Sequence, residues 1–156
     1  MRLPEPSLQA VYTILPATWR DLNALRRLER ICFPNDYWPL LDLIGVLTFP
    51  NIIRFKAEVG DEMAGFSAAE RRKGEDLGWI ATIGVLPEYR RRGIATALLE
   101  TSEKSLNVAR IRLNVRASNH EAICLYRHLG FQEVSLWPAY YLDKEDALVL
   151  EKQIRP

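Results

Sequence analysis

Cysteine, histidine and methionine are scarce in this sequence, which holds two of each among its 156 residues. Cys32 and Cys124 lie far apart in the chain, so the sequence has neither a disulfide framework nor the paired spacing of a zinc site. We therefore expect no bound metal. Two unpaired thiols are typical of a reducing compartment, which predicts a cytoplasmic location.

The sequence also lacks a long apolar run and a strong charge of either sign. Its longest apolar stretch, residues 40–47, is interrupted by Asp42 and is too short to span a bilayer. The formal net charge is +1 at pH 7, whereas a domain that neutralises a phosphate backbone is usually far more basic. We therefore expect neither a membrane nor a nucleic acid as partner. With a hydrophobic fraction of 48%, residues 1–156 are predicted to form a single domain, with residues 1–9 as a flexible lead.

Apolar spacing along the chain predicts the element order β-α-α-β-β-β-α-β-α-β-β. Strands are expected at residues 11–15, 51–59, 63–70, 78–86, 111–116, 131–137 and 147–154, and helices at about 18–32, 40–47, 94–107 and 119–129. Ser118, three residues before Glu121, is the expected N-cap of the last helix. The β-α-β unit over residues 78–116 predicts a parallel strand pair in a mixed α/β sheet, with ligand at the carboxyl ends of the pair.

A basic turn lies between one of these strands and the next helix. Residues 90–92 are all arginine, and Gly93 and Ala95 follow them at the start of the helix. A strand, a glycine-containing basic turn and a helix N-terminus together make a set of main-chain N–H groups that suits a phosphate. Taken alone, such a turn is also typical of a solvated surface.

Two motifs together resemble the acetyl-CoA segments of the GCN5-related N-acetyltransferase (GNAT) superfamily. They are Arg90-x-x-Gly93-x-Ala95 and Asn119-x-x-Ala122-x-x-x-Tyr126-x-x-x-Gly130-Phe131. The resemblance covers nearly the whole chain. It implies a single-domain α/β GNAT fold with a mixed sheet of six to seven strands, about four helices and a parallel strand pair that is splayed apart.

The same resemblance implies acetyl-CoA as cosubstrate and names the residues that hold it. These are Ile83 and Val85 through their main chain, Arg90, Arg91, Gly93 and Ala95 around the pyrophosphate, and Asn119 and Tyr126 in the second segment. Tyr126 is also the general acid by this resemblance, although without it a tyrosine on the apolar stripe of a helix is more typical of core packing.

Further stretches at residues 33–37, 113–119 and 139–147 are similar to protein N-terminal acetyltransferases of the ribosomal-protein alanine type. The similarity implies that the enzyme acetylates the α-amino group of a protein or peptide N-terminus. It also implies a peptide groove walled by Phe33, Pro34, Tyr37, Tyr140 and Tyr141. From composition alone these aromatic residues also fit loop packing. The alternatives are a small-molecule amine acetyltransferase and a non-catalytic acyl-CoA-binding sensor.

The general base is where the sequence departs from its relatives. At the position of Asn114, on the polar face of the strand at residues 111–116, they carry glutamate or histidine. An amide cannot accept a proton at neutral pH, so Asn114 is expected at most to position a water molecule. His120 and His128 are expected on a solvated helix surface. The sequence therefore assigns Tyr126 and Asn114 to the catalytic site and leaves the base unidentified.

Overall fold

The structure is a computed structural model, which describes residues 11–155; the lead predicted at residues 1–9 lies outside them. The strands are β1 (Thr13–Pro16), β2 (Ile52–Val59), β3 (Glu62–Arg71), β4 (Leu77–Val85), β5 (Arg110–Arg116), β6 (Gln132–Trp137) and β7 (Ala147–Gln153). The helices are α1 (Leu22–Cys32), α2 (Leu40–Thr48), α3 (Ile94–Leu106) and α4 (His120–His128), with short 3₁₀ turns η1 (Trp19–Asp21) and η2 (Pro87–Tyr89). Apart from these two turns, the element order is the predicted one.

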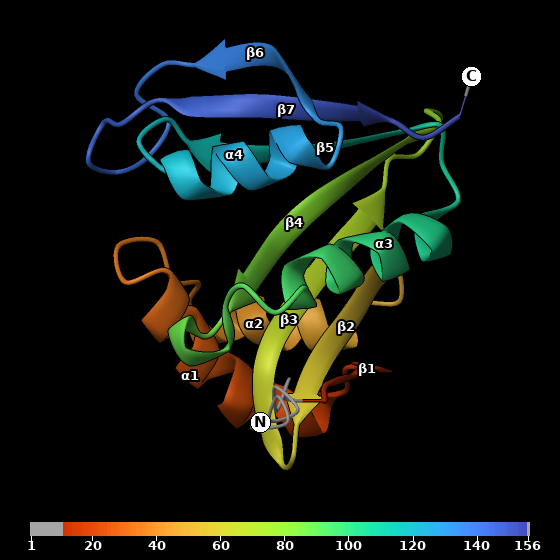
Figure 1. The fold of residues 1–156 in the computed structure, drawn as a ribbon, viewed down its shortest axis with the longest axis vertical. Coiled ribbons are helices and arrows are strands. Elements are labelled where there is room, and N and C mark those ends of the chain that lie inside the picture. Colours follow the sequence, from red (N-terminus) through yellow and green to blue (C-terminus); the bar gives the residue numbers. More distant parts are fainter. Residues whose placement is uncertain (1–10, 156) are drawn as a thin grey trace, which may run out of the picture.

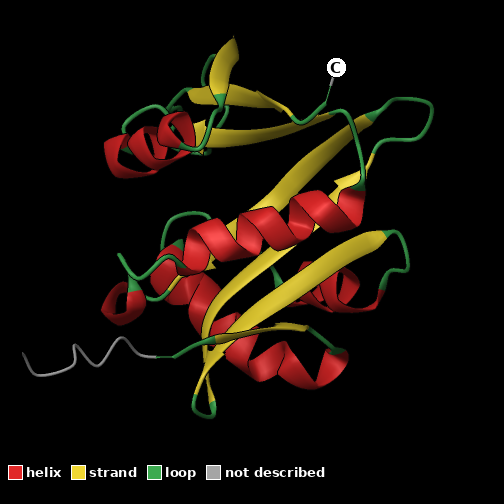
Figure 2. Cartoon of the chain, turned by 45° about the vertical axis from the view of Figure 1, so that its right-hand side comes forward, coloured by secondary structure: helices red, strands yellow, loops and turns green. Residues whose placement is uncertain are grey.

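The seven strands form one sheet in the order β1-β2-β3-β4-β5-β7-β6 (Figure 1). Every neighbouring pair is antiparallel except β4 and β5, which are parallel as predicted. Helices α3 and α4 share a core with one face of the sheet, and α1 and α2 pack on the other face (Figure 2). No helix within residues 11–155 is long and apolar enough to cross a membrane.

Small residues on β3 bring α3 close to the sheet. A Cβ on Gly65 would come within 3.0 Å of the Ile94 side chain and 3.1 Å of the Leu98 side chain. Farther along, the hydroxyl groups of Ser67 and Ser102 lie 3.2 Å apart in the same buried interface. Because α3 rests on these small residues, its N-terminus is held next to the end of β4.

The parallel pair is splayed, as the family resemblance implied. β4 and β5 are paired only where Leu77–Trp79 faces Arg110–Arg112. Beyond that point β4 runs on to Val85, and the two strands diverge (Figure 1). Opposite β3, Ala69 pairs with Ile80 and Ala68 with Thr82, which leaves Ala81 as an extra residue in β4. Such a β-bulge bends its strand and increases its twist, which accounts for the parting of β4 from β5.

The N-cap of α4 is one residue later than predicted. Asn119 accepts a hydrogen bond from the N–H of Ala122 through Oδ1 at 3.2 Å, and so caps the helix. The expected cap, Ser118, instead donates its hydroxyl to Glu145. The capping-box spacing of Ser118 and Glu121 was misleading because a distant carboxylate competes for the Ser118 hydroxyl.

Candidate active site

The open edge of β4 presents main-chain groups at the point where the parallel pair has parted. Successive strand residues direct these groups to opposite edges. Leu86 donates its N–H to the carbonyl oxygen of Ala64 at 2.8 Å, so Leu86 and Gly84 face β3. Ile83 and Val85 therefore direct their main-chain groups toward the gap beside β5. Both belong to the residues assigned to cofactor contacts from the sequence.

The turn between β4 and α3 combines arginines with two left-handed residues. Arg91 has φ +63°, and Gly93, the N-cap of α3, has φ +83°. Left-handed residues in such a turn direct N–H groups to one side, and the helix N-terminus adds partial positive charge. A Cβ on Gly93 would meet the hydroxyl of Tyr12 at an ordinary 3.7 Å, so backbone conformation rather than space favours glycine here. The geometry suits a phosphate.

Arg90 is fastened to the end of β4. Its Nε donates to the carbonyl oxygen of Val85 at 3.0 Å, and Sγ of Cys32 donates to the same oxygen at 3.4 Å. Burial raises the pKa of the Cys32 thiol, and Arg90 offsets part of that rise, so the thiol is protonated at neutral pH. Two donors already occupy the Val85 carbonyl oxygen.

The other two residues assigned to the pyrophosphate differ in exposure. Ala95, in the first turn of α3, is half-buried, and Arg91 is exposed.

Tyr126 lies in the core beside β5 and close to the loop between β6 and β7. Its side chain is 8% exposed, and its ring packs edge-on against Phe131 with centroids 5.8 Å apart. Burial raises the pKa of Tyr126 above its ordinary value of 10, and the neighbouring Tyr141 adds to the rise. The phenol is therefore protonated at neutral pH. Core packing and proton donation are compatible roles for this residue.

Asn114 lies on the half-buried face of β5, and it contacts Tyr141 from the β6–β7 loop. Its Nδ2 donates to the hydroxyl oxygen of Tyr141 at 3.4 Å. Arg116, two residues farther along β5, places its guanidinium carbon 4.2 Å from the centre of the Tyr141 ring. Asn114, Tyr126 and Tyr141 thus bring together β5, α4 and the β6–β7 loop.

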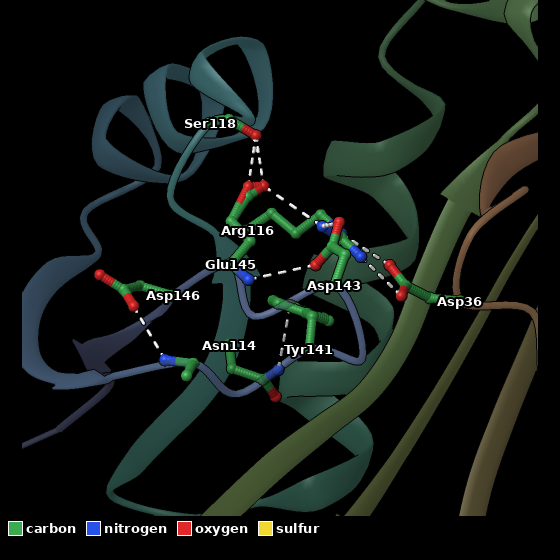
Figure 3. A network of polar contacts seen from close by, with 9 residues as sticks. Asp36, Asn114, Arg116, Ser118, Tyr141, Asp143, Glu145 and Asp146 are labelled. Carbon is green, nitrogen blue, oxygen red and sulfur yellow. Dashed lines mark hydrogen bonds and ion pairs between the residues drawn. The ribbon is translucent and has the colours of Figure 1, made fainter.

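Arg116 joins the loop after α1 to the loop between β6 and β7 (Figure 3). It forms a bidentate pair with Asp36, with both distances at 2.7 Å. It also pairs with Asp143 at 2.8 Å and with Glu145 at 3.3 Å. We call these four residues the Arg116 cluster. Its three carboxylates outnumber its single guanidinium, so the cluster attracts cations.

A cleft of about 630 Å³ opens between the two loops that the Arg116 cluster connects. It is lined by Pro34, Asn35, Tyr37, Arg116, Leu142 and Asp143. Pro34 and Tyr37, both assigned to a peptide groove from the sequence, thus lie in the cleft wall. Tyr37 is 48% exposed, and the guanidinium of Arg30 lies 5.4 Å from its ring centre.

The other three groove residues inferred from the sequence have different neighbours. The ring of Phe33 packs beneath β4, where a Cβ on Gly84 would approach it to 3.2 Å. Tyr140 lies between two rings, with centroids 5.1 Å from Trp137 and 5.1 Å from Tyr141. Phe33 therefore supports the β4 edge, while the two tyrosines order the β6–β7 loop.

Sequence reasoning missed a buried carboxylate beside this site. Glu29 of α1 is 1% exposed, and its Oε1 accepts a hydrogen bond from Thr82 Oγ1 at 3.2 Å. Burial raises the pKa of Glu29 from 4.5 to about 7, more than the Thr82 hydroxyl and the main-chain N–H of Trp38 lower it. One signal was available: Glu29 lies four residues after Leu25, on the apolar stripe of its helix.

The sequence comparisons agree with this geometry. Residues 11–131 match the acetyltransferase (GNAT) family. The N-alpha-acetyltransferase of Saccharolobus solfataricus is 32% identical, and the match covers 99% of this chain and all of the relative. The catalytic subunit NAA10 of the N-terminal acetyltransferase A complex of Arabidopsis thaliana is 28% identical, over 89% of this chain and 76% of the relative.

Solved structures give the same result. The ribosomal-protein-S18-alanine N-acetyltransferase of Escherichia coli superposes with a TM-score of 0.84 at 30% identity, over 94% of this chain and 96% of that one. NAA60 of Arabidopsis thaliana in complex with a bisubstrate analogue superposes with a TM-score of 0.81 at 26% identity, over 92% of this chain and 98% of that one. This chain belongs to the GNAT family. It is an N-acetyltransferase, similar along its whole length to enzymes named as N-alpha-acetyltransferases.

Proposed function

We propose that this enzyme transfers the acetyl group of acetyl-CoA to the α-amino group of a protein N-terminus, in the cytoplasm. The observation that carries the proposal is a cleft between the loop after α1 and the β6–β7 loop, whereas α3 and its N-terminal turn lie on the opposite face of the sheet from α1. The proposal brings the acceptor through this cleft and the cofactor to the α3 turn. The end-to-end similarity to an archaeal N-alpha-acetyltransferase supports the choice of acceptor, and the two free thiols support the location.

The cofactor would lie along the gap between β4 and β5. Its pyrophosphate is assigned to the turn of Arg90, Arg91, Gly93 and Ala95, and its pantetheine arm to the main chain of Ile83 and Val85. Asn119, the N-cap of α4, and Tyr126 within the helix would complete this side. The solved NAA60 complex with acetyl-CoA supports the assignment of the cosubstrate.

The acceptor would enter the cleft lined by Pro34 and Tyr37, with Tyr140 and Tyr141 ordering the opposite loop and Phe33 supporting the β4 edge. An amino terminus is cationic before it reacts. The surplus carboxylates of the Arg116 cluster would attract it toward the cleft.

The chemistry requires attack of a neutral amine on a thioester. The amine nitrogen bonds to the carbonyl carbon, and the carbonyl oxygen gains negative charge that the N–H of Ile83 can stabilise. The carbon–sulfur bond then breaks, and Tyr126 donates its proton to the leaving thiolate. Asn114 holds Tyr141 in place and can position a water molecule beside the amine.

The test is to incubate the enzyme with acetyl-CoA and a panel of acceptors, and to measure released thiol and acetylated product. The panel holds peptides that differ in their first residue, the same peptides with blocked amino termini, and small primary amines. We expect turnover on free peptide amino termini. Turnover on small amines alone would point to a small-molecule acetyltransferase, and binding of acetyl-CoA without turnover would point to a sensor. Either result would overturn the proposal.

A further inference from the structure

Glu29 is a buried carboxylate one hydrogen bond from β4, and the chemistry proposed above names no residue that accepts the proton of the amine. It projects from the buried face of α1 toward Thr82. The pairing of β4 with β5 ends at Trp79, and Thr82 lies three residues farther along β4, directly after the bulged Ala81. Its main chain faces β3, whereas that of its neighbour Ile83 faces the gap. Glu29 is therefore one hydroxyl group away from the part of β4 assigned to the thioester.

The two oxygens of Glu29 have unequal surroundings. Oε1 accepts the Thr82 hydroxyl, while Oε2 is the single buried side-chain oxygen or nitrogen among residues 11–155 that no donor meets with hydrogen-bond geometry. The main-chain N–H of Trp38 lies close enough to lower the pKa of the carboxyl without completing such a bond. A buried carboxylate with an unpaired oxygen is destabilising. If this position served only to pack α1 against β4, an apolar side chain of the same size would stabilise the fold better. The unpaired oxygen leaves room for a proton on this carboxylate.

The charged and titratable groups around Glu29 are few. One turn along α1 lies the protonated Cys32 thiol, and Arg90 reaches Cys32 from the end of β4. From the loop after α1 comes the main-chain N–H of Trp38. The residues that the segment before η1, helix α2 and strand β3 contribute to the core around α1 are apolar: Ala17, Leu43, Val46, Leu47, Phe66 and Ala68. Burial rather than a neighbouring charge thus controls the protonation of Glu29.

We propose that Glu29 takes up the proton that the acceptor amine loses, with the Thr82 hydroxyl as the link between them. The inference rests on the proposed function, because it names the base that the acetyl transfer requires. Thr82 donates its hydroxyl proton to Glu29 and accepts one from the amine, directly or through a water molecule. Glu29 acts through Thr82 and need not touch the substrate.

The protons balance. An ammonium acceptor carries three protons on nitrogen, and the amide product keeps one. The first proton to leave passes through Thr82 to the Glu29 carboxylate and later to solvent. The second replaces the proton that Tyr126 gives to the thiolate. The new carbon–nitrogen bond forms as the carbon–sulfur bond breaks, and no oxidant, reductant or metal is needed.

The decisive variant is Glu29→Gln, which keeps an oxygen that can accept the Thr82 hydrogen bond but cannot take up a proton at neutral pH. We expect kcat at pH 7 to fall about 10²-fold or more, with unchanged affinity for acetyl-CoA. The matched control is Glu100→Gln on the exposed face of α3, which should retain wild-type kcat. Wild-type kcat in Glu29→Gln would overturn the proposal.

The pH profile separates a proton acceptor from a structural residue. Below pH 7, the pair of Glu29 and the ammonium acceptor must lose one proton before Glu29 can accept the amine's proton. Above the amine pKa of about 8 the acceptor arrives neutral and no longer needs this step. The ratio of wild-type to Glu29→Gln kcat/KM for the acceptor should therefore be largest at pH 7 and below, and should shrink as the pH rises above 8. A ratio that stays constant from pH 6 to pH 9 would show a structural role and would contradict the proposal.

Thr82 supplies an independent pair of variants. Thr82→Val removes the hydroxyl with little change in shape and should lower kcat as Glu29→Gln does, whereas Thr82→Ser should keep most of the activity. Wild-type activity in Thr82→Val would contradict the link. The ratio of wild-type to variant kcat is measured with both a peptide and a small primary amine as acceptor. If the wild-type enzyme acetylates only the small amine, the proposed peptide acceptor is wrong, but the kcat ratio for Glu29→Gln on that amine still tests the role of Glu29. Turnover of neither acceptor would contradict both proposals.

Discussion

The two faces of the sheet at β4, one covered by α3 and the other by α1, differ in the chemical groups that they present. On the α3 side, the proposed cofactor site consists of main-chain groups and one tight turn, held in place by the close packing of α3 on Gly65 and Ser67. On the α1 side, it consists of charged and aromatic side chains that three separate segments bring together around Arg116. The first side should therefore be sensitive to changes of backbone conformation, and the second to changes of charge.

The largest effect is expected from Gly93→Glu on the α3 side. The variant adds bulk and negative charge at a left-handed turn residue where a pyrophosphate would sit. We expect affinity for acetyl-CoA, measured by calorimetry, to fall at least about 100-fold, or roughly 3 kcal/mol.

Gly60→Glu is the matched control for Gly93→Glu. Gly60 has φ +59° in the hairpin turn between β2 and β3, and a Cβ at this position would meet nothing within 4 Å. The control therefore carries similar backbone strain far from the proposed phosphate. Equal affinities of the two variants for acetyl-CoA would remove the phosphate assignment.

Tyr126→Phe tests the core side chain that is also proposed as the general acid. The ring and its packing against Phe131 remain, but the proton donor is lost. We expect kcat to fall about 10²-fold with little change in KM for acetyl-CoA. Tyr89→Phe, which removes a hydroxyl bonded to Glu62 instead, should keep the wild-type kcat. Wild-type kcat in Tyr126→Phe would return Tyr126 to core packing alone.

On the α1 side, we expect Glu29→Gln to change stability and activity in opposite directions. The pKa of Glu29 rises from 4.5 to about 7 on folding because the folded protein favours the protonated carboxyl. The contribution of Glu29 to the free energy of unfolding is therefore fully present below pH 4.5 and is lost as the pH rises through 7. The loss is roughly 3 kcal/mol at most, from 1.36 kcal/mol per pKa unit. Glu29→Gln should therefore gain stability relative to wild type between pH 5 and pH 8, while its activity is low.

Denaturant unfolding of both proteins at the two pH values measures this difference. The surface carboxylates Glu62, Asp76 and Asp143 have lowered pKa values, so their contribution is lost only as the pH falls further, and it is common to both proteins. A stability difference that does not change with pH would show that Glu29 keeps one protonation state throughout.

A smaller effect is expected from the charges that connect the two loops. Arg116→Lys retains the positive charge but loses the bidentate pair with Asp36. We expect KM for a peptide acceptor to rise about 10-fold, or 1.4 kcal/mol, with KM for acetyl-CoA unchanged. Parallel increases in both KM values would show that the two sides of β4 are not independent.

The smallest effects are expected from the aromatic residues at the two loops. Tyr37→Ala and Tyr140→Ala should each raise KM for a peptide acceptor several-fold and spare KM for acetyl-CoA, which initial-rate kinetics would measure. If both variants bind peptide as wild type does, the groove is assigned to the wrong residues.

The α3 side was accessible from the sequence because its parts are local. The strand, the arginine turn and Gly93 follow one another directly, and the parallel pair follows from the β-α-β order. The α1 side depends on contacts between distant residues. The ion pair of Asp36 with Arg116 and the bond of Ser118 to Glu145 decide the loop positions, and neither has a spacing signal. Glu29 was missed because a single carboxylate on an apolar stripe shows its importance only once Thr82 is placed beside it.

The choice of an α-amine over a lysine side chain follows from the modest strength of the proposed base. Forming a neutral α-amine of pKa 7.7 to 8.0 at pH 7 costs about 1 to 1.4 kcal/mol, whereas a lysine of pKa 10.4 costs about 4.6 kcal/mol. A carboxylate with a pKa of about 7 is matched to the first task and not to the second.

The most direct test is mass spectrometry of one lysine-containing peptide, offered with its amino terminus free and with it blocked, after incubation with enzyme and acetyl-CoA. We expect a single acetyl group on the free peptide, located at its α-amine, and none on the blocked peptide. Equal acetylation of the two peptides would contradict the proposed function.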